Sequence, residues 1–294
     1  MRQISITDVT IRQAGKAAGY TLSFREKIEL AKLLARAGVS VIELPPIEHV
    51  KIDSLLIKSV ASAVTQSAVS VPVALSAEGV ENVWAALKEA KFPRLQVAAP
   101  VSAVQMEYLA GKKPAAMREA VAETVAACRK KCGNVEFMAD DATRADPVFL
   151  YDILRAAIAA GATSVTVCDT AGTMMPDEFS TFIGTIYENV PELAGVTLGV
   201  SCANTLAMAD ACAMAAIGQG VGEVKAAAYC VNTADLRHIA ALFAAKGAEA
   251  GIGSTLAQTQ IRRILEQAAW MCQTGRSKTS PFDNGVQAGD GTFL

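Results

Sequence analysis

The sequence predicts a single (β/α)8 barrel of the TIM type. Short β-branched runs alternate with longer Ala-rich helical stretches along the chain, which is the pattern of parallel strands joined by crossover helices. Hydrophobic residues make up 52% of the chain and aromatic residues only 5%, so Ala, Val, Ile and Leu must build the core. The length of 294 residues fits one closed barrel, because such barrels commonly reach about 250 residues.

Eight segments are predicted to be the barrel strands. Each is a short apolar or β-branched run, and they cover residues 4–11, 39–44, 69–75, 95–99, 135–139, 164–168, 196–201 and 223–229. A helix is expected over residues 23–37, because Ser23 and Glu26 have the spacing of a capping box and Gly38 marks a stop.

The end of the chain is predicted to extend the barrel. Helices over about residues 236–245 and 256–272 would close it, so the barrel domain covers residues 1–273. Residues 274–294 are rich in Gly, Ser and Asp, and we expect an irregular tail or a loop over a site. A doubly wound open sheet is the alternative fold. It normally has a glycine-rich loop after its first strand, where this chain has Asp8-Val9-Thr10-Ile11-Arg12.

Composition argues against several classes of protein. The net charge is -2 and no basic run forms a footprint for a phosphate backbone, so no nucleic-acid partner is expected. No signal segment or membrane-length apolar window is visible, so we expect a cytoplasmic protein with no membrane partner. The seven cysteines follow no metal-binding spacing and are predicted to be reduced structural thiols.

Candidate site residues are the polar ones at the strand ends. The active site of such a barrel lies at the carboxyl ends of its strands. The residues that meet this criterion are Asp8, Thr10, Arg12, Glu43, Ser76, Asp140, Asp141, Arg144, Asp169, Thr170, Ser201, Asn204 and Asn232.

Five motifs in order carry a family resemblance. Residues 8–12 resemble a D-x-T-L-R-D-G signature, residues 41–43 a second-strand I-E, and residues 106–108 an H-M-E-Y segment. Residues 140–146 resemble E-D-A-x-R-x-D, and residues 169–172 with Pro176 resemble D-T-x-G and its following proline. Over about residues 4–245 the chain thus resembles the barrel shared by isopropylmalate synthase, homocitrate synthase and HMG-CoA lyase, the DRE-TIM metallolyase or pyruvate carboxyltransferase type. The resemblance implies acyltransferase or lyase chemistry, a divalent metal, acyl-CoA and a homodimer.

The metal positions depart from the family. In the family the ion is held by an Asp after the first-strand Arg, by both His of an H-x-H-N-D motif, and by a later Asn. Here Gln13, Ser201 and Ala203 stand at three of these positions, and only Asn232 matches. An amide, a hydroxyl and a methyl group cannot replace a carboxylate and two imidazoles. We therefore expect no high-affinity metal there, and no other cofactor is predicted.

The two histidines and the segment that would frame a CoA also give little support for the family's chemistry. His49 and His238 are expected at the surface with no pairing group. Family members frame the CoA with a glycine-rich stretch before the metal-binding Asn, but this chain has only Tyr229-Cys230-Val231-Asn232. CoA use is therefore not favoured, and Cys230 is interpreted as a structural thiol.

A polar cup remains at the barrel mouth. Arg12 is suited to grip a carboxylate or polarise a keto oxygen. Glu43 is a base, a group that orients Arg12, or a structural ion-pair partner of it. The predicted substrate-binding residues are Asp8, Thr10, Gln13, Ser76, Asp169, Thr170, Ser201, Asn204 and Asn232. A role in fixing loops is an alternative interpretation of Asp169 and Thr170. A salt-bridged loop is the interpretation of Asp140, Asp141 and Arg144.

Three functional hypotheses stay open. The first is an enzyme that makes or breaks a carbon-carbon bond at a 2-oxo acid with Arg12 in place of a metal. The second is a non-catalytic barrel, a pseudoenzyme, that binds a small carboxylate or a protein partner. The third is an enzyme that holds its metal through Asp8, Asn204 and Asn232.

Overall fold

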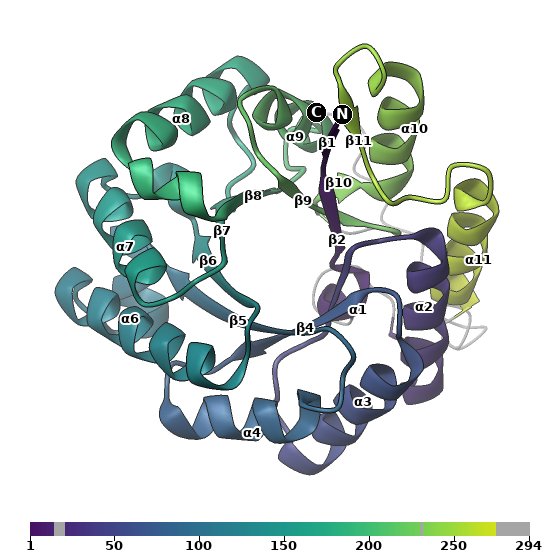
Figure 1. Cartoon of the computed structure of the whole chain (residues 1–294), viewed down its shortest axis with the longest axis horizontal. Helices are drawn as coiled ribbons and strands as arrows, with labels where there is room; N and C mark the ends of the chain where they lie inside the picture. Colours follow the sequence, from purple (N-terminus) through teal and green to yellow (C-terminus); the bar gives the residue numbers. More distant parts are fainter. Residues whose placement is uncertain (15–20, 230–231, 275–294) are drawn as a thin grey trace, which may run out of the picture.

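The computed structural model describes residues 1–14, 21–229 and 232–274. Within them, the parallel strands from β2 to β9 form a closed ring, because β2 pairs with both β3 and β9, and β8 also pairs with β9. Helices surround this ring on the outside (Figure 1). The prediction of a (β/α)8 TIM barrel is therefore confirmed.

The elements follow one another in the alternating order of a barrel. The strands are β1 (Arg2–Gln3), β2 (Ser5–Asp8), β3 (Val41–Glu43), β4 (Ala68–Val73), β5 (Pro93–Pro100), β6 (Val135–Asp140), β7 (Ser164–Asp169), β8 (Thr197–Cys202), β9 (Glu223–Ala227), β10 (Ala234–Asp235) and β11 (Ile252–Gly253). The helices are α1 (Thr10–Gln13), α2 (Phe24–Ala37), α3 (Val50–Ala63), α4 (Ala77–Leu87), α5 (Ala103–Gln105), α6 (Pro114–Lys131), α7 (Pro147–Ala159), α8 (Pro176–Asn189), α9 (Ala209–Gly218), α10 (Leu236–Lys246) and α11 (Ile261–Thr274). A π-helical turn η1 (Met106–Ala110) and the 3-10 turns η2 (Ala142–Arg144) and η3 (Pro191–Gly195) complete them.

The first barrel strand is shorter than predicted. It was expected to run to Ile11, but β2 ends at Asp8. The Oδ1 atom of Asp8 accepts a hydrogen bond from the backbone N–H of Thr10 at 2.9 Å, which turns the chain into the short helix α1. The turn matters for function because it carries Arg12 to the mouth of the barrel.

The helix boundaries follow local sequence signals. Helix α2 begins after Ser23 with the predicted capping box to Glu26, and it ends at Gly38, which has a φ of 82°. Helix α11 begins at Ile261, later than the predicted residue 256, because residues 258–260 form a turn in which the N–H of Ile261 donates to the carbonyl of Ala257. It packs beside α2 and α10 (Figure 1). Of the predicted tail, residues 274–294, only Thr274 is described, and it is the last residue of α11; residues 275–294 lie outside the described residues.

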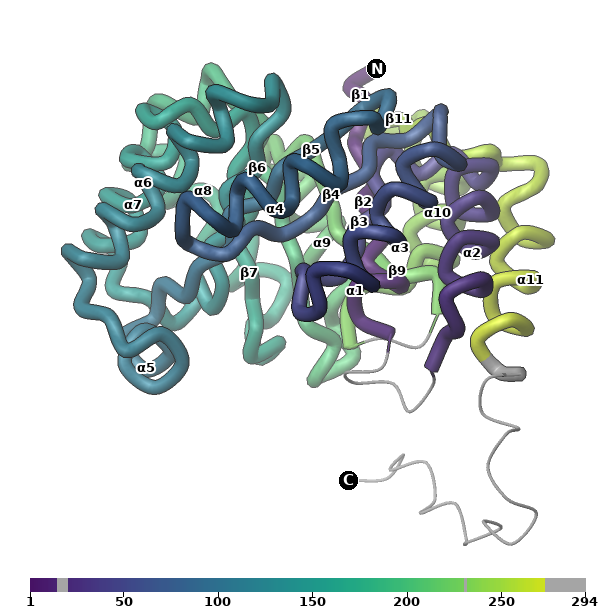
Figure 2. The backbone as a smooth tube through the Cα atoms, turned by 90° about the horizontal axis from the view of Figure 1, so that it is seen from below, coloured from purple at the N-terminus to yellow at the C-terminus, as the bar shows by residue number. Residues whose placement is uncertain are grey.

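The carboxyl ends of the strands gather at one end of the barrel. Figure 2 shows α1 and α5, which follow β2 and β5, at the end opposite the N-terminus. The barrel interior is tightly filled. At Gly199 on β8 an added Cβ would lie 2.7 Å from Oγ1 of Thr166 and 3.4 Å from Cβ of Glu223. Glycine is required at this position because the interior side chains leave no room for a methyl group.

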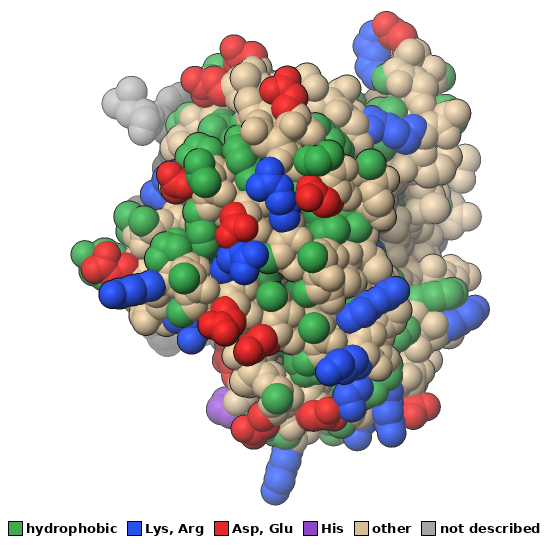
Figure 3. All heavy atoms as spheres, turned by 60° about the vertical axis from the view of Figure 1, so that its left-hand side comes forward, with side chains coloured by type: hydrophobic (Ala, Val, Ile, Leu, Met, Phe, Trp, Pro, Cys, Tyr) green, Lys and Arg blue, Asp and Glu red, His purple; other side chains and the backbone are tan. Residues whose placement is uncertain are grey.

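The outer surface shows no strongly charged face in the view drawn. Acidic and basic side chains are interspersed with apolar ones in Figure 3. None of the helices in the described part of the chain is long and apolar enough to cross a membrane.

Candidate active site

A polar cavity of about 400 Å³ opens at the carboxyl ends of the strands. Six of the residues predicted to be catalytic or to bind substrate line it together: Arg12, Gln13, Asp169, Thr170, Ser201 and Asn232. The other lining residues are Val9, Met138, Asp140, Cys168, Ala203, Lys225 and Thr233. The structure thus brings side chains from both ends of the chain to one site, as the barrel prediction requires.

Arg12 is held at the cavity wall by Glu43. Its Nη1 atom lies 2.7 Å from Oε2 of Glu43, and the Arg12 side chain is 23% exposed while that of Glu43 is fully buried. The other oxygen, Oε1, accepts hydrogen bonds from Gln96 at 2.7 Å and from Lys225. Burial opposes ionisation of Glu43, but Lys225 and Arg12 outweigh it and lower its pKa. Glu43 is therefore an ionised anchor for Arg12, with both oxygens occupied.

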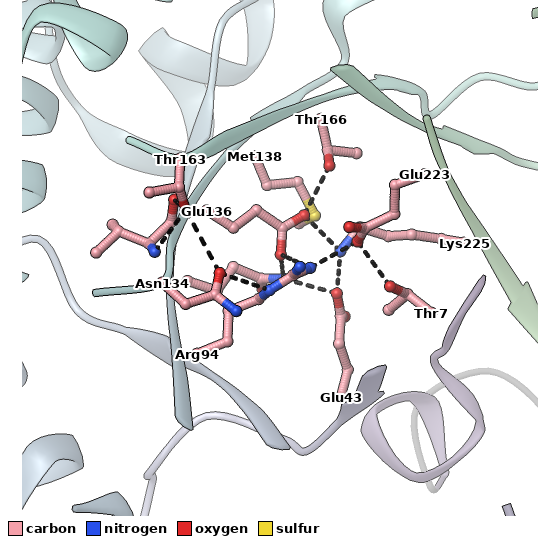
Figure 4. A network of polar contacts seen from close by, with 12 residues as sticks. Thr7, Glu43, Arg94, Asn134, Glu136, Met138, Thr163, Thr166, Glu223 and Lys225 are labelled. Carbon is pink, nitrogen blue, oxygen red and sulfur yellow. Dashed lines mark hydrogen bonds and ion pairs between the residues drawn. The ribbon is translucent and has the colours of Figure 1, made fainter. Parts of the chain in front are cut away.

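A buried ion network adjoins the cavity through Lys225 (Figure 4). The Nζ atom of Lys225 contacts Oε1 of Glu43 and lies 2.7 Å from Oε1 of Glu136. Nη1 of Arg94 lies 2.7 Å from Oε1 of Glu223 and 3.9 Å from Oε2 of Glu136. The three carboxylates of the network face three cations, which are Arg12, Arg94 and Lys225. Burial alone would lower the Lys225 pKa, but Glu136 and Glu43 raise it, so Lys225 is an ammonium ion.

Asp140 is the cavity residue whose charge is most readily changed. Burial raises the pKa of its carboxyl group to about 6, although the positive charge of Arg12 and a hydrogen bond with Cys168 oppose that shift. It is therefore mostly a carboxylate at neutral pH but can take up a proton more readily than an ordinary aspartate, which suits proton transfer.

The loop after β6 behaves differently from its neighbour Asp140. Asp141 and Arg144 form the predicted ion pair, with Nε and Nη2 of Arg144 each 2.8 Å from a carboxylate oxygen. Asp140 was grouped with them as a loop residue, but it lines the cavity instead. The difference arises because Asp140 is the last residue of β6, whereas Asp141 has already turned with a φ of 61°.

Four other predicted substrate-binding residues do not line the cavity. Asp8 and Thr10 are fully buried, and both accept a hydrogen bond from the backbone N–H of Ala228, so they join β2 to the end of β9. Burial raises the Asp8 pKa to about 7. Ser76 caps α4 by accepting from the N–H of Gly79 at 3.1 Å, and it borders a separate hollow. The side chain of Asn204 accepts from the N–H of Ala209 at 3.1 Å.

Asp169 and Thr170 do line the cavity, yet both also fix loops. Oδ1 of Asp169 accepts from Thr143 Oγ1 at 2.9 Å and from the N–H of Gly172 at 3.1 Å. Oγ1 of Thr170 accepts from the N–H of Asp141 at 2.9 Å. The loop-fixing interpretation of these two residues is thus present in the structure alongside their contact with the cavity.

Sequence reasoning missed the buried network. Its members lie at alternate strand positions, which in a barrel point to the same side, and they are Arg94 and Gln96 on β5, Glu136 on β6, and Glu223 and Lys225 on β9. Charged residues with a period of two inside otherwise apolar strands were the signal that could have found them. Attention to strand ends alone passed over this pattern.

The residues at the family's metal positions do not fit a divalent ion. Gln13, Ser201 and Ala203 offer no charged donor, and Oδ1 of Asn232 already accepts a hydrogen bond from the N–H of Asn204 at 2.8 Å. Asp140, a carboxylate of the same lining, already has Arg12 and Lys225 as cationic neighbours. Among the described residues, no three His, Cys, Asp or Glu side chains cluster in a way that could hold a metal.

The histidines and cysteines lie mostly as expected. His49 and His238 are exposed, but the expectation that no group pairs them was wrong for His238, whose Nδ1 lies 2.7 Å from Oδ2 of Asp210. Spacing along the chain could not reveal this pair because α9 and α10 meet only in the fold. The six described cysteines are buried, whereas Cys230 lies outside the described residues.

Fold and cavity together define a TIM barrel with a polar cavity at the carboxyl ends of its strands, where enzymes of this fold usually have their active site. The model of the HMGL-like family matches residues 3–265. The chain therefore belongs to the HMGL-like family.

Several relatives of this chain are 2-isopropylmalate synthases. Over 227 residues the chain is 33% identical to that of Pelotomaculum thermopropionicum, an alignment that covers 77% of this chain and 45% of the relative. Over 270 residues it is 32% identical to that of Halothermothrix orenii, covering 90% of this chain and 52% of the relative. The chain thus spans about half the length of these relatives.

Solved structures share the fold at low sequence identity. The HMG-CoA lyase of Brucella melitensis superposes with a TM-score of 0.74 at 16% identity, covering 94% of this chain and 100% of that one. An HMG-CoA lyase of Acinetobacter baumannii, solved in complex with coenzyme A and 3-methylmalate, gives 0.73 at 14% identity, covering 99% and 98%. These likenesses establish the shared barrel.

Proposed function

We propose that this barrel makes or breaks a carbon-carbon bond at a 2-oxo acid, without a divalent ion at the family's metal position. The observation that carries the proposal is that Arg12, fixed by Glu43 at 2.7 Å, shares one cavity with Asp140, whose carboxyl pKa is raised to about 6. An anion-binding group and a proton-transfer group are thus placed around one small volume.

Arg12 supplies recognition in this proposal. Its guanidinium offers a planar fork of donors that matches a carboxylate, and the ion pair with Glu43 holds that fork in place before the ligand arrives. The same donors can stabilise negative charge on the neighbouring oxo oxygen as the reaction proceeds.

Asp140 moves the proton. Its carboxylate removes a proton from the carbon beside the oxo group, and the electron pair of that C–H bond moves to the oxo oxygen to give an enolate. In bond formation the enolate carbon then attacks a carbonyl carbon of the second substrate, and the carbonyl oxygen takes the proton from Asp140 to become a hydroxyl group. In the cleavage direction Asp140 removes the proton of that hydroxyl group, the carbon-carbon bond breaks to give a carbonyl group and the same enolate, and protonated Asp140 returns the proton to the enolate carbon.

Proton exchange tests this step without knowledge of the second substrate. Purified protein is incubated in D2O with pyruvate or 2-oxobutyrate, and the proton signals beside the oxo group are followed by NMR. We expect their loss in the presence of the wild type. Arg12→Lys should slow it about 10-fold to 100-fold, since a hydrogen bond to a charged group contributes roughly 1.5–3 kcal/mol. Asp140→Asn should slow it by about 10² to 10⁴.

Arg129→Lys is the matched control, because Arg129 is exposed on the outer helix α6 and donates to the carbonyl of Gly133. It should exchange at the wild-type rate. A parallel thermal-shift screen of small carboxylates reports binding alone. Equal rates in all variants would remove Arg12 and Asp140 from the reaction. Stabilisation by an acid without exchange would favour the non-catalytic barrel.

Acetyl-CoA is not expected to be the second substrate, because the segment before Asn232 is short and has no glycine. Part of that segment, Cys230 and Val231, lies outside the described residues. Calorimetry that detects micromolar affinity for acetyl-CoA would contradict this expectation. The homodimer implied by the resemblance stays a prediction, and so does the cytoplasmic location expected from the sequence.

A further inference from the structure

Lys225 is a buried cation that reaches the candidate active site. It comes from β9, the last strand of the barrel, and is only 1% exposed, yet it is part of the cavity lining. Figure 4 shows Lys225 inside the buried network, beside Glu43 and Glu136. The cavity lining therefore contains this buried cation as well as the partly exposed Arg12.

The hydrogen bonds of Lys225 leave one donor for a ligand. An ammonium group has three N–H donors. Glu43 and Glu136 each accept one of them, and within the described ranges no third protein acceptor contacts Nζ. Both accepting carboxylates are fully buried and absent from the cavity lining, whereas Lys225 belongs to it, so its remaining donor is the one available to a ligand.

The surroundings hold this donor rigidly. Glu43 is fixed by Arg12 and Gln96, and Glu136 accepts from Gln96 at 2.9 Å and from Thr166 at 2.7 Å. A charge fixed in a site sheltered from water stabilises a developing negative charge more strongly than an exposed lysine, because the group needs no reorganisation during the reaction.

We propose that the ammonium group of Lys225 donates its third N–H to the oxo oxygen of the bound 2-oxo acid, and so provides the positive charge at the enolate in place of a divalent ion. This inference rests on the proposed function and adds a catalytic residue to it. Lys225 keeps its proton throughout: the proton from carbon goes to Asp140, and the hydrogen bond to the oxygen strengthens as the enolate forms.

The test uses a charge-balanced variant, because Lys225→Met alone leaves two buried carboxylates without their cation. Lys225→Met/Glu136→Gln removes one positive and one negative charge together. Lys131→Met is the matched control, since Lys131 lies on outer helix α6 and pairs with Glu81 at 2.8 Å near the surface. Thermal melts establish that each variant is folded before its activity is compared.

The readouts are pyruvate exchange in D2O and binding of oxalate, a planar dianion that resembles the enolate of pyruvate. We expect the double variant to lose about 10² to 10³ in exchange rate, the range for removal of one oxyanion donor, and at least about 10-fold in oxalate affinity. Glu136→Gln, which keeps the ammonium and an oxygen that can accept from it, measures the effect of the second substitution alone and should lose less in both measurements than the double variant. Lys131→Met should match the wild type in both measurements.

The possible outcomes distinguish a failure of this inference from a failure of the proposed function. If the wild type neither exchanges nor binds any 2-oxo acid, the proposed function fails. If the wild type exchanges and the folded double variant exchanges equally fast, Lys225 has no catalytic role. Borohydride treatment with pyruvate provides a further check. Covalent trapping on Lys225 would overturn the role as an ammonium donor, because an amine must lose its proton to attack a carbonyl carbon.

Discussion

Removal of Lys225 should expose how much the barrel depends on its buried network. In Lys225→Met, Glu43 and Glu136 lose the ammonium that lies between them, while both stay fully buried. Breaking a buried ion pair from one side destabilises a protein by roughly 3–5 kcal/mol. That is a large fraction of the roughly 5–15 kcal/mol free energy of unfolding of a typical domain.

The charge-balanced variant should recover much of this loss. With Glu136→Gln added, Glu43 and Glu223 still face Arg12 and Arg94, so the network is neutral again. Urea unfolding of the wild type, both single variants and the double variant gives the coupling free energy between the two positions. We expect the double variant to be more stable than Lys225→Met by at least about 1 kcal/mol.

The loss in Lys225→Met should also depend on pH. Without the ammonium, burial raises the pKa of one of the two carboxyl groups above its value in the unfolded chain. A carboxyl group with a raised pKa in the folded state favours folding at low pH, and this stabilisation is lost as pH rises through the folded pKa. The variant should therefore be closer to the wild type at pH 5 than at pH 8. A loss below about 1 kcal/mol, or a double variant no more stable than Lys225→Met, would refute the account of the network.

Three further predictions concern packing, proton transfer and metal. Gly199→Ala should lower the free energy of unfolding by about 1–3 kcal/mol, because its methyl group would lie 2.7 Å from Oγ1 of Thr166. At Gly195 an added Cβ meets no atom within 4 Å, so Gly195→Ala should change the free energy of unfolding much less in the same urea titration. Exchange of pyruvate protons should increase as pH rises through about 6, since Asp140 acts as a base only after it loses its proton, and a pH-rate profile without that rise would exclude it as the base. Elemental analysis after dialysis against a chelator should find well under one equivalent of Zn, Mn or Mg, and a stoichiometric metal would contradict our interpretation of Gln13, Ser201 and Ala203.

The sequence predicted the barrel because its signals are local. Strand runs, helix periodicity, the capping box at Ser23 and the stop at Gly38 each depend on residues a few positions apart. Eight predicted strands appear in the order expected, with errors of a few residues at their ends. The family motifs also led to Arg12 and Glu43, and the structure joins these two residues in one ion pair.

Placement around the cavity could not be predicted in the same way. Asp8 and Asp140 both end a strand. The carboxylate of Asp8 accepts hydrogen bonds from the backbone N–H groups of Thr10 and Ala228, whereas Asp140 lines the cavity. Strand-end position fixes which end of the barrel a residue occupies. It does not fix whether its side chain faces the ligand or the backbone of a neighbouring strand.

What the sequence by itself determined is the architecture, the family and the set of polar residues at the barrel mouth. What only the tertiary structure decided is the electrostatics of the site, because charges separated along the chain meet only when the barrel closes. Lys225 lies 182 positions from Glu43 in the chain, and their contact converts a candidate base into a fixed anchor and an inconspicuous strand residue into a buried cation of the cavity lining. Interactions between charges depend on distance in space and on burial, and neither can be read from the order of residues.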